Sequence, residues 1–271
     1  MEKRYNAKWL WSLCRGGLLS VSLLLVSGMA MAQLDGTYTI NSASATSGTN
    51  FKSFADLASA LKSNGVKGAV TVNVVASSGP YSESVSFEPA SGASATNTIT
   101  INGNGETITT TSSTEVIDMN GADFMTFKNL KIDAAGTGNN TKCVLMSDNA
   151  DNNTFDGCEM IVSRYRGPSK TTADVAFSGS RTSVRSTGNH GSHNTFKNNK
   201  MWNGTTGYTY GPYYGIAEYY NYATGNNTFD NNDMSSVYYY LMYNYYSSGY
   251  KITNNDFHNQ RNGANYAYVT Y

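Results

Sequence analysis

Two groups of side chains in the second half of the sequence could bind a ligand, and the first of them is basic. Residues 162–200 carry seven Lys or Arg and a single acidic residue, Asp174. The candidate ligand-binding residues among them are Arg164, Arg166, Lys170, Arg181 and Arg185. Guanidinium and ammonium groups pair with carboxylates, so this segment could attract an anionic polysaccharide. A solubilising loop without a ligand explains the same charges equally well.

The second group is aromatic. Fourteen of the 21 tyrosines fall between Tyr208 and Tyr250, several of them in adjacent pairs. Adjacent residues of a strand face opposite ways, so each pair should place at least one ring on the outside. Stacked rings could then bind sugar faces; the candidate residues are Tyr213, Tyr214, Tyr219, Tyr220, Tyr243 and Tyr245. Simple cross-strand packing of rings is the alternative, and it is favoured because tyrosine suits strands in any setting.

No constellation in the sequence predicts catalysis or a metal site. His190 and His193 have no Cys, Asp or Glu nearby to complete a ligand set, and the acidic residues are spread thinly. We therefore name no catalytic residue, no metal ligand and no cofactor. The near-neutral charge gives no reason to expect a nucleic-acid partner. Cys143 and Cys158 could form a disulfide, but we expect buried free thiols.

The elements that must position these side chains are indicated by a repeated phrase. Its second residue is always large and apolar, and in five of the six copies another apolar residue follows five places later. The large apolar residues are Ile101, Phe127, Phe155, Phe196, Phe229 and Ile252. Spacings of 23 to 41 residues suit successive turns of a coil whose strands bury one another. A β-sandwich with Asn-rich turns is the alternative, although hairpin signals are scarce.

The fourth residue of the phrase is always Gly or Asn. These two residues adopt a positive φ most readily, so each copy predicts a left-handed corner between two strands. The predicted corner column consists of Gly103, Asn129, Gly157, Asn198, Asn231 and Asn254. Asn199, Asn232 and Asn255 follow the corner in consecutive turns, and we expect their side chains to form a hydrogen-bonded ladder.

The first 32 residues have the pattern of a secretory signal peptide. Basic residues precede the apolar run Leu18–Val26, and small residues at 30–32 predict cleavage after Ala32. Residues 33–95 differ from the repeats and predict an N-terminal cap with a strand, a helix beginning near Ser53, and the first strands. Residues 96–271 then form the coils. Because the sequence stops inside an apparent strand, we expect a missing C-terminal part of the same chain.

These features together resemble the right-handed parallel β-helix of the pectin-lyase-like kind. The segment from Phe54-Ala55-Asp56-Leu57 to Ile99-Thr100-Ile101-Asn102-Gly103 is similar to the cap region of secreted bacterial surface proteins with this fold. The resemblance implies an all-β solenoid. The Arg-x-Pro-x-x-Arg motif of one pectate lyase family is begun by Arg166-Gly167-Pro168, but Thr171 stands in place of the second Arg.

The sequence thus predicts a secreted or cell-surface protein with a structural or adhesive role. An aromatic and basic face would bind cell-surface glycan. One alternative is a lyase or glycoside hydrolase acting on acidic polysaccharide, with calcium if it is a lyase. Another alternative is a spacer rod without a ligand. No span of the mature chain is apolar enough to cross a membrane.

Overall fold

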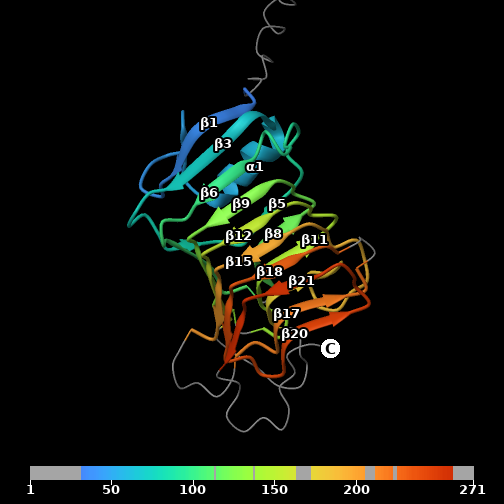
Figure 1. Ribbon diagram of the computed structural model, residues 1–271. Coiled ribbons are helices and arrows are strands. Elements are labelled where there is room, and N and C mark those ends of the chain that lie inside the picture. The colour runs from blue at the N-terminus through green and yellow to red at the C-terminus, as the bar shows by residue number, and fades with distance from the viewer. Residues whose placement is uncertain are drawn as a thin grey trace, which may run out of the picture. The chain divides into compact units, whose positions relative to one another are not determined.

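The structure is a computed structural model, and it describes residues 32–112, 114–136, 138–162, 172–204, 211–221 and 225–258. These residues wind into successive coils, each of which contributes one strand to each of three parallel sheets (Figure 1). All pairings between the named strands are parallel. The predicted all-β parallel β-helix is therefore confirmed.

The three sheets are named A, B and C in the order in which each coil visits them. Sheet A contains, in spatial order, β2 (Asn50–Phe51), β1 (Leu34–Ile40), β3 (Val66–Val74), β6 (Ile99–Asn102), β9 (Met125–Lys128), β12 (Thr154–Asp156), β15 (Thr195–Lys197), β18 (Thr228–Asp230) and β21 (Lys251–Thr253). Sheet B contains β4 (Tyr81–Ser82), β7 (Thr107–Thr110), β10 (Lys131–Ala134), β13 (Glu159–Val162), β16 (Lys200–Trp202), β19 (Asp233–Ser235) and β22 (Asp256–His258). Sheet C contains β5 (Val85–Phe87), β8 (Glu115–Asn120), β11 (Lys142–Ser147), β14 (Ala173–Phe177), β17 (Tyr214–Tyr219) and β20 (Tyr240–Tyr245).

The core of the coils is a column of stacked phenylalanines. Phe127, Phe155, Phe196 and Phe229 are in register on sheet A and fully buried. Their successive ring centroids lie 4.8, 5.0 and 5.5 Å apart, with the rings nearly parallel. Burial of each ring contributes roughly 1.5–3 kcal/mol, and stacking adds to it. The apolar residue of each repeated phrase is therefore the residue that holds neighbouring coils together.

The predicted corner column is left-handed in five of its six copies. The φ angles of Asn129, Asn198, Asn231 and Asn254 lie between 49° and 56°, and Gly157 has 67°. Gly103 contradicts the prediction, because its corner is longer and Asn104 and Gly105 are the left-handed residues there. A glycine is still required at 103, since a Cβ would lie 2.7 Å from the Asn129 carbonyl oxygen.

The predicted asparagine ladder is present. The side-chain oxygens of Asn199, Asn232 and Asn255 accept hydrogen bonds from the backbone N–H of Cys158, Asn199 and Asn232, at 2.8–3.0 Å. Each Nδ2 also donates to a phenylalanine carbonyl of an earlier coil. A second ladder, which we did not predict, joins Asn153, Asn194 and Asn227 at the opposite end of the sheet A strands.

The helix α1 (Phe54–Asn64) is the one predicted from the sequence. Ser53 is its N-cap and accepts a hydrogen bond from the Asp56 N–H at 3.0 Å, and Gly65 ends it with φ 67°. Phe54, Leu57 and Leu61 are buried, and the Phe54 ring contacts Tyr81 of the first coil edge-on, with ring centroids 5.2 Å apart. Residues 81–87 form two strands, because the chain turns a corner between β4 and β5.

Cys143 and Cys158 are free and buried, as expected. Burial raises the pKa of the Cys158 thiol to about 12, so it stays protonated. Among the described residues, no helix is long and apolar enough to cross a membrane. The predicted signal peptide, residues 1–32, lies outside the described residues except for Ala32.

Candidate functional site

The candidate site lies on the outer face of sheet C. Alternation along β8 turns Ile117 and Met119 toward the core, so Asp118 points outward. Glu115 lies two places before Ile117, so alternation alone does not place it on the outer face, but its carboxylate is bound there by Arg181. Register then builds outward columns across the coils. One column runs Glu115, Lys142, Ala173, Tyr214, Tyr240, and the next runs Asp118, Leu145, Ala176, Ala217, Tyr243. The face is therefore charged on β8 and β11 and aromatic on β17 and β20.

A compact loop, residues 178–188, crosses this face after β14. The Ser178 hydroxyl organises it by donating to the Ser183 carbonyl and accepting from the N–H groups of Ser180 and Ser186. Val184 is fully buried among the residues of the aromatic part. The loop sends Arg181 to the charged strands and Arg185 to the tyrosines. It thereby divides the face into two hollows.

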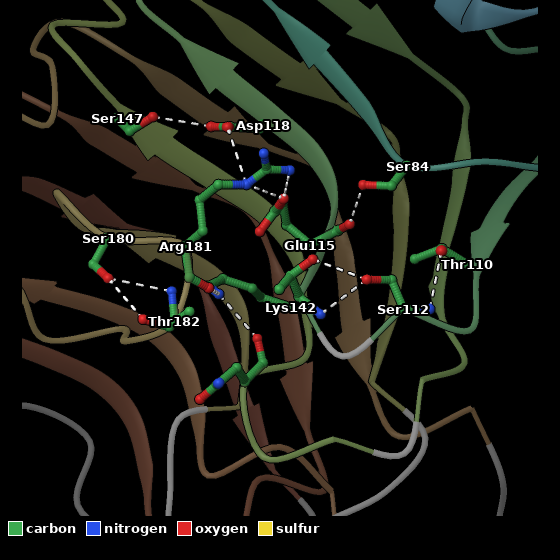
Figure 2. Close-up of polar contacts among 12 residues, drawn as sticks. Ser84, Thr110, Ser112, Glu115, Asp118, Lys142, Ser147, Ser180, Arg181 and Thr182 are labelled. Atoms are coloured by element: carbon green, nitrogen blue, oxygen red, sulfur yellow. Dashed lines mark hydrogen bonds and ion pairs between the residues drawn. The ribbon is translucent and has the colours of Figure 1, made fainter.

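The charged part is a network of the buried Glu115, Asp118 and Lys142 and the exposed Arg181 (Figure 2). Arg181 donates two hydrogen bonds to Glu115 Oε1, of which the one from Nε is 2.7 Å long. Arg181 Nε also lies 3.8 Å from Asp118 Oδ2. Lys142 Nζ donates to the Arg181 carbonyl at 2.7 Å and to the Asn140 carbonyl at 2.9 Å. Two cations thus face two carboxylates, and Lys142 also fixes the loop backbone.

Burial shifts the pKa of two members of this network. The pKa of Asp118 is raised to about 6, chiefly by desolvation, while the Ser147 hydroxyl bond at 2.9 Å opposes the shift. Desolvation lowers the pKa of Lys142 to about 8, and the nearby Glu115 and Asp118 limit that shift. Asp118 can therefore exchange a proton near neutral pH, which is the range in which general acids and bases operate.

The first hollow, the polar pocket, has a volume of about 150 Å³. Its polar lining side chains are Asp118, Asn120, Ser147, Asp148, Ser180 and Arg181. Asp118 is only 3 % exposed, whereas Asp148 lies on the open side of the pocket. Carboxylate, amide and hydroxyl oxygens dominate this lining, so the pocket offers mainly hydrogen-bond acceptors.

The second hollow, the tyrosine groove, has a volume of about 320 Å³. It is lined by Arg185 together with Tyr213, Tyr214, Tyr219, Tyr240, Tyr243 and Tyr245. Rings of β17 and β20 stack in register: Tyr214 on Tyr240 at 5.5 Å, and Tyr219 on Tyr245 at 5.3 Å. Arg185 forms a side-chain hydrogen bond with Tyr243. A guanidinium thus lies beside the tyrosine side chains that line the groove.

The predicted ligand-binding residues differ in where the structure places them. Arg164, Arg166 and Lys170 lie outside the described residues. The expectation that each tyrosine pair leaves an exposed ring is wrong for Tyr213 and Tyr214, which are 8 % and 1 % exposed. The loop and the next coil cover them. Tyr243 is buried as well.

The remaining candidates lie at or beside the two hollows. Tyr220 stacks on the exposed Tyr246 at 4.7 Å, next to the groove. Arg185 lines the groove and remains exposed. Arg181 is not a free surface cation, because its guanidinium is bound to Glu115.

Sequence reasoning missed Glu115, Asp118 and Lys142. The signal was present: Glu115 and Asp118 flank the apolar pair Val116-Ile117, so a buried strand had to carry two carboxylates. Lys142 is the first residue of β11, the matching strand of the next coil, and pairs with Glu115. Among the described residues, no group of three or more His, Cys, Asp or Glu side chains is placed to hold a metal ion.

Comparison with known proteins supports the fold. A pectin methylesterase mutant, solved in complex with hexasaccharide IV, aligns with a TM-score of 0.54 and 14 % identity. The alignment covers 85 % of this chain and 68 % of that one. No protein-family model and no curated protein matches the sequence. The chain therefore has a pectin-lyase-like parallel β-helix fold, as its resemblance implied.

Proposed function

We propose that this protein is a secreted or cell-surface β-helix protein with a structural or adhesive role, and that it binds acidic glycan in the tyrosine groove. The observation that carries the proposal is Arg185, which lines an open hollow together with six tyrosines. A sugar ring stacks on aromatic faces, and phenol groups hydrogen-bond its hydroxyls. The guanidinium pairs with a uronate carboxylate in the fork geometry that arginine favours.

The similar solved structure adds support for a saccharide as the ligand class. That protein is a pectin methylesterase and was crystallised with a hexasaccharide. Because the sequence identity is only 14 %, the similarity establishes the fold alone. The choice of an acidic glycan therefore rests on Arg185 and on the tyrosines. A pure spacer would have no need of a cation above a polar aromatic hollow.

The location follows from the first residues of the sequence. Residues 1–32 have the basic, apolar and small-residue order of a secretory signal peptide, with cleavage after Ala32. In this proposal residues 33–95 are the N-terminal cap and 96–271 are the coils. Expression with residues 1–32 intact, followed by N-terminal sequencing of the exported protein, tests the position of cleavage. A mature protein that begins elsewhere than Gln33 would reject that position.

Glycan binding is tested directly with the wild-type protein and Arg185→Ala on arrays of acidic and neutral polysaccharides. We expect binding to polyuronates, and at least about tenfold weaker binding for Arg185→Ala, because a charge-assisted hydrogen bond contributes roughly 1.5–3 kcal/mol. Lys52→Ala is the matched control, since Lys52 is an exposed cation outside the groove. Equal binding by the wild type and Arg185→Ala would reject the groove as the site.

The same polysaccharides distinguish a binding protein from an enzyme. Incubation with polyuronates, with and without calcium, should release neither unsaturated ends nor new reducing ends. Release of either product, and its loss in Asp118→Asn, would replace the adhesive role with a lyase or hydrolase activity in the polar pocket.

A further inference from the structure

The polar pocket has an electrostatic character opposite to that of the tyrosine groove. Among the described residues that line it, Arg181 is the one cation, and its guanidinium is already bound to the fully buried Glu115. Lys142 and Arg181 together balance Glu115 and Asp118, so Asp148 leaves the pocket with a net negative charge. The groove, by contrast, presents the exposed Arg185. Both hollows belong to the outer face of one sheet.

Asp118 has an oxygen available for a ligand. Its Oδ1 accepts the Ser147 hydroxyl at 2.9 Å. Its Oδ2 lies 3.8 Å from Arg181 Nε, which is beyond hydrogen-bond distance. Among the described residues, no N–H or O–H is recorded within that distance of Oδ2. Asp118 is 3 % exposed, and its Oδ2 forms an ion pair with Arg181 but no hydrogen bond, so this oxygen can accept a hydrogen bond from a further cationic donor.

The two hollows are close enough to bind one oligosaccharide. Strand β8 carries Asp118, and β17 carries the first groove tyrosines. These strands are separated by β11 and β14, so three strand spacings place them about 14 Å apart. That distance is within the length of a short sugar chain. We propose that the polar pocket binds the protonated amine of an amino sugar, within the same acidic glycan whose uronate is bound by Arg185.

This inference rests on the proposed glycan-binding function and narrows its ligand to a zwitterionic polysaccharide. An ammonium group can donate three hydrogen bonds, and Asp118 Oδ2, Asp148 and a serine hydroxyl can accept them. A calcium ion suits the pocket less well, because it requires six to eight oxygen ligands. The nearby guanidinium would also repel a doubly charged ion more strongly than an ammonium group.

The test uses calorimetric titration of the full chain with three soluble probes. These are an alternating uronate–glucosamine oligosaccharide with free amines, its N-acetylated form, and an oligouronate of equal length. We expect the free-amine probe to bind about tenfold more tightly than the N-acetylated form, since only the amine carries a charge. Asp118→Asn should reduce this ratio to about one and leave oligouronate binding unchanged.

Two further variants keep the test decisive. Asp133→Asn is the control, because Asp133 of β10 is also a partly buried carboxylate, with its pKa raised chiefly by burial, but lies on sheet B. It should leave the ratio intact. If Asp118→Asn fails to fold, Asp148→Asn replaces it, since Asp148 is exposed and should still lower the ratio.

The outcomes separate this inference from the proposed function. One outcome is that the oligouronate binds, while the free-amine and N-acetylated oligosaccharides bind with equal affinity. That result would overturn the amine site and leave the proposed binding in the tyrosine groove intact. Failure of all three probes to bind would reject both. Binding of calcium chloride alone, abolished by Asp118→Asn, would identify a metal site and overturn the amine assignment. The amine preference should also vanish on going from pH 7 to pH 5, as Asp118 takes up a proton.

Discussion

At the scale of single residues, this protein tolerates ionisable groups where a solenoid usually places apolar ones. Glu218 of β17 points into the core, in the column that holds Met119, Met146 and Phe177 in earlier coils. It is 1 % exposed, and the Asn221 amide donates a hydrogen bond to its Oε1. Desolvation raises the pKa of Glu218 to about 8, so the side chain is largely protonated at neutral pH.

A pH dependence of stability follows from Glu218. As pH rises above its usual pKa of 4.5, the unfolded chain loses this proton while the folded chain keeps it until about pH 8. The folded state then binds more protons, so its free energy of unfolding falls across this window. Glu218→Gln should remove this decrease in the free energy of unfolding. The variant should therefore be more stable than the wild type at pH 8 by a few kcal/mol. Urea unfolding of the wild type and of Glu218→Gln at pH 5, 6, 7 and 8 measures the two free energies of unfolding. An identical pH dependence in the two proteins would contradict the raised pKa of Glu218.

The charged network on sheet C illustrates which residues a sequence can reveal. Clusters of tyrosine and arginine are visible as composition, and they led to Arg185 and to most of the groove. Asp118 and Lys142 have ordinary neighbours in sequence. They are brought together because β8 and β11 are in register and because the loop returns Arg181 over them. The loop path depends on contacts from four different coils, which local patterns do not encode.

At the scale of the elements, the corner asparagines determine how coils are joined. Asn232 is buried, its Oδ1 accepts from the Asn199 N–H, and its Nδ2 donates to the Phe196 carbonyl. Asn232→Ala leaves both groups without their partner. Because an unsatisfied buried polar group costs about 1–3 kcal/mol, we expect a loss of roughly 2–4 kcal/mol in the free energy of unfolding. Chemical denaturation gives the value.

A suitable control for Asn232→Ala is Asn189→Ala, because Asn189 has an exposed side chain. That substitution should change stability by less than about 0.5 kcal/mol. A loss of similar size in both variants would mean that the ladder makes no special contribution.

The repeated phrase made most of these elements predictable. Phe127, Phe155 and Phe196 mark sheet A strands, and the Gly or Asn two places later marks the corner into sheet B. The prediction failed at Gly103 because the sequence does not distinguish a glycine needed for a positive φ from a glycine needed for a close approach of two backbones. The second ladder was readable in principle, since Asn153, Asn194 and Asn227 each precede the threonine of the phrase.

Charge order on the outer faces adds a constraint on register. On sheet A, Lys128, Asp156, Lys197 and Asp230 face outward from consecutive coils, so charge alternates from one strand to the next. Lys197 Nζ lies 3.4 Å from an Asp156 oxygen. Exposed pairs of this kind contribute little to stability. A slip by one coil would oppose like charges, so alternation disfavours wrong stacking.

At the scale of the whole molecule, stability should decrease from the central coils toward the last described ones. In a solenoid each coil is stabilised only by its neighbours. Phe155 and Phe196 are fully buried between aromatic neighbours, whereas Ile252, in the same column on β21, is 39 % exposed. Amide exchange should therefore be slowest in β12 and β15 and fastest in β21 and β22.

Two substitutions in this one column test that view of the molecule. Phe196→Ala removes a ring that stacks on both Phe155 and Phe229, and should cost about 3–5 kcal/mol. Exchange should accelerate in β12 and β18, because both lose a stacking partner. Ile252→Ala should cost less than about 1 kcal/mol and affect only β21 and its immediate neighbours. If Phe196→Ala accelerated exchange uniformly from β1 to β22, the coils would unfold as one cooperative unit and not as a series of coupled neighbours.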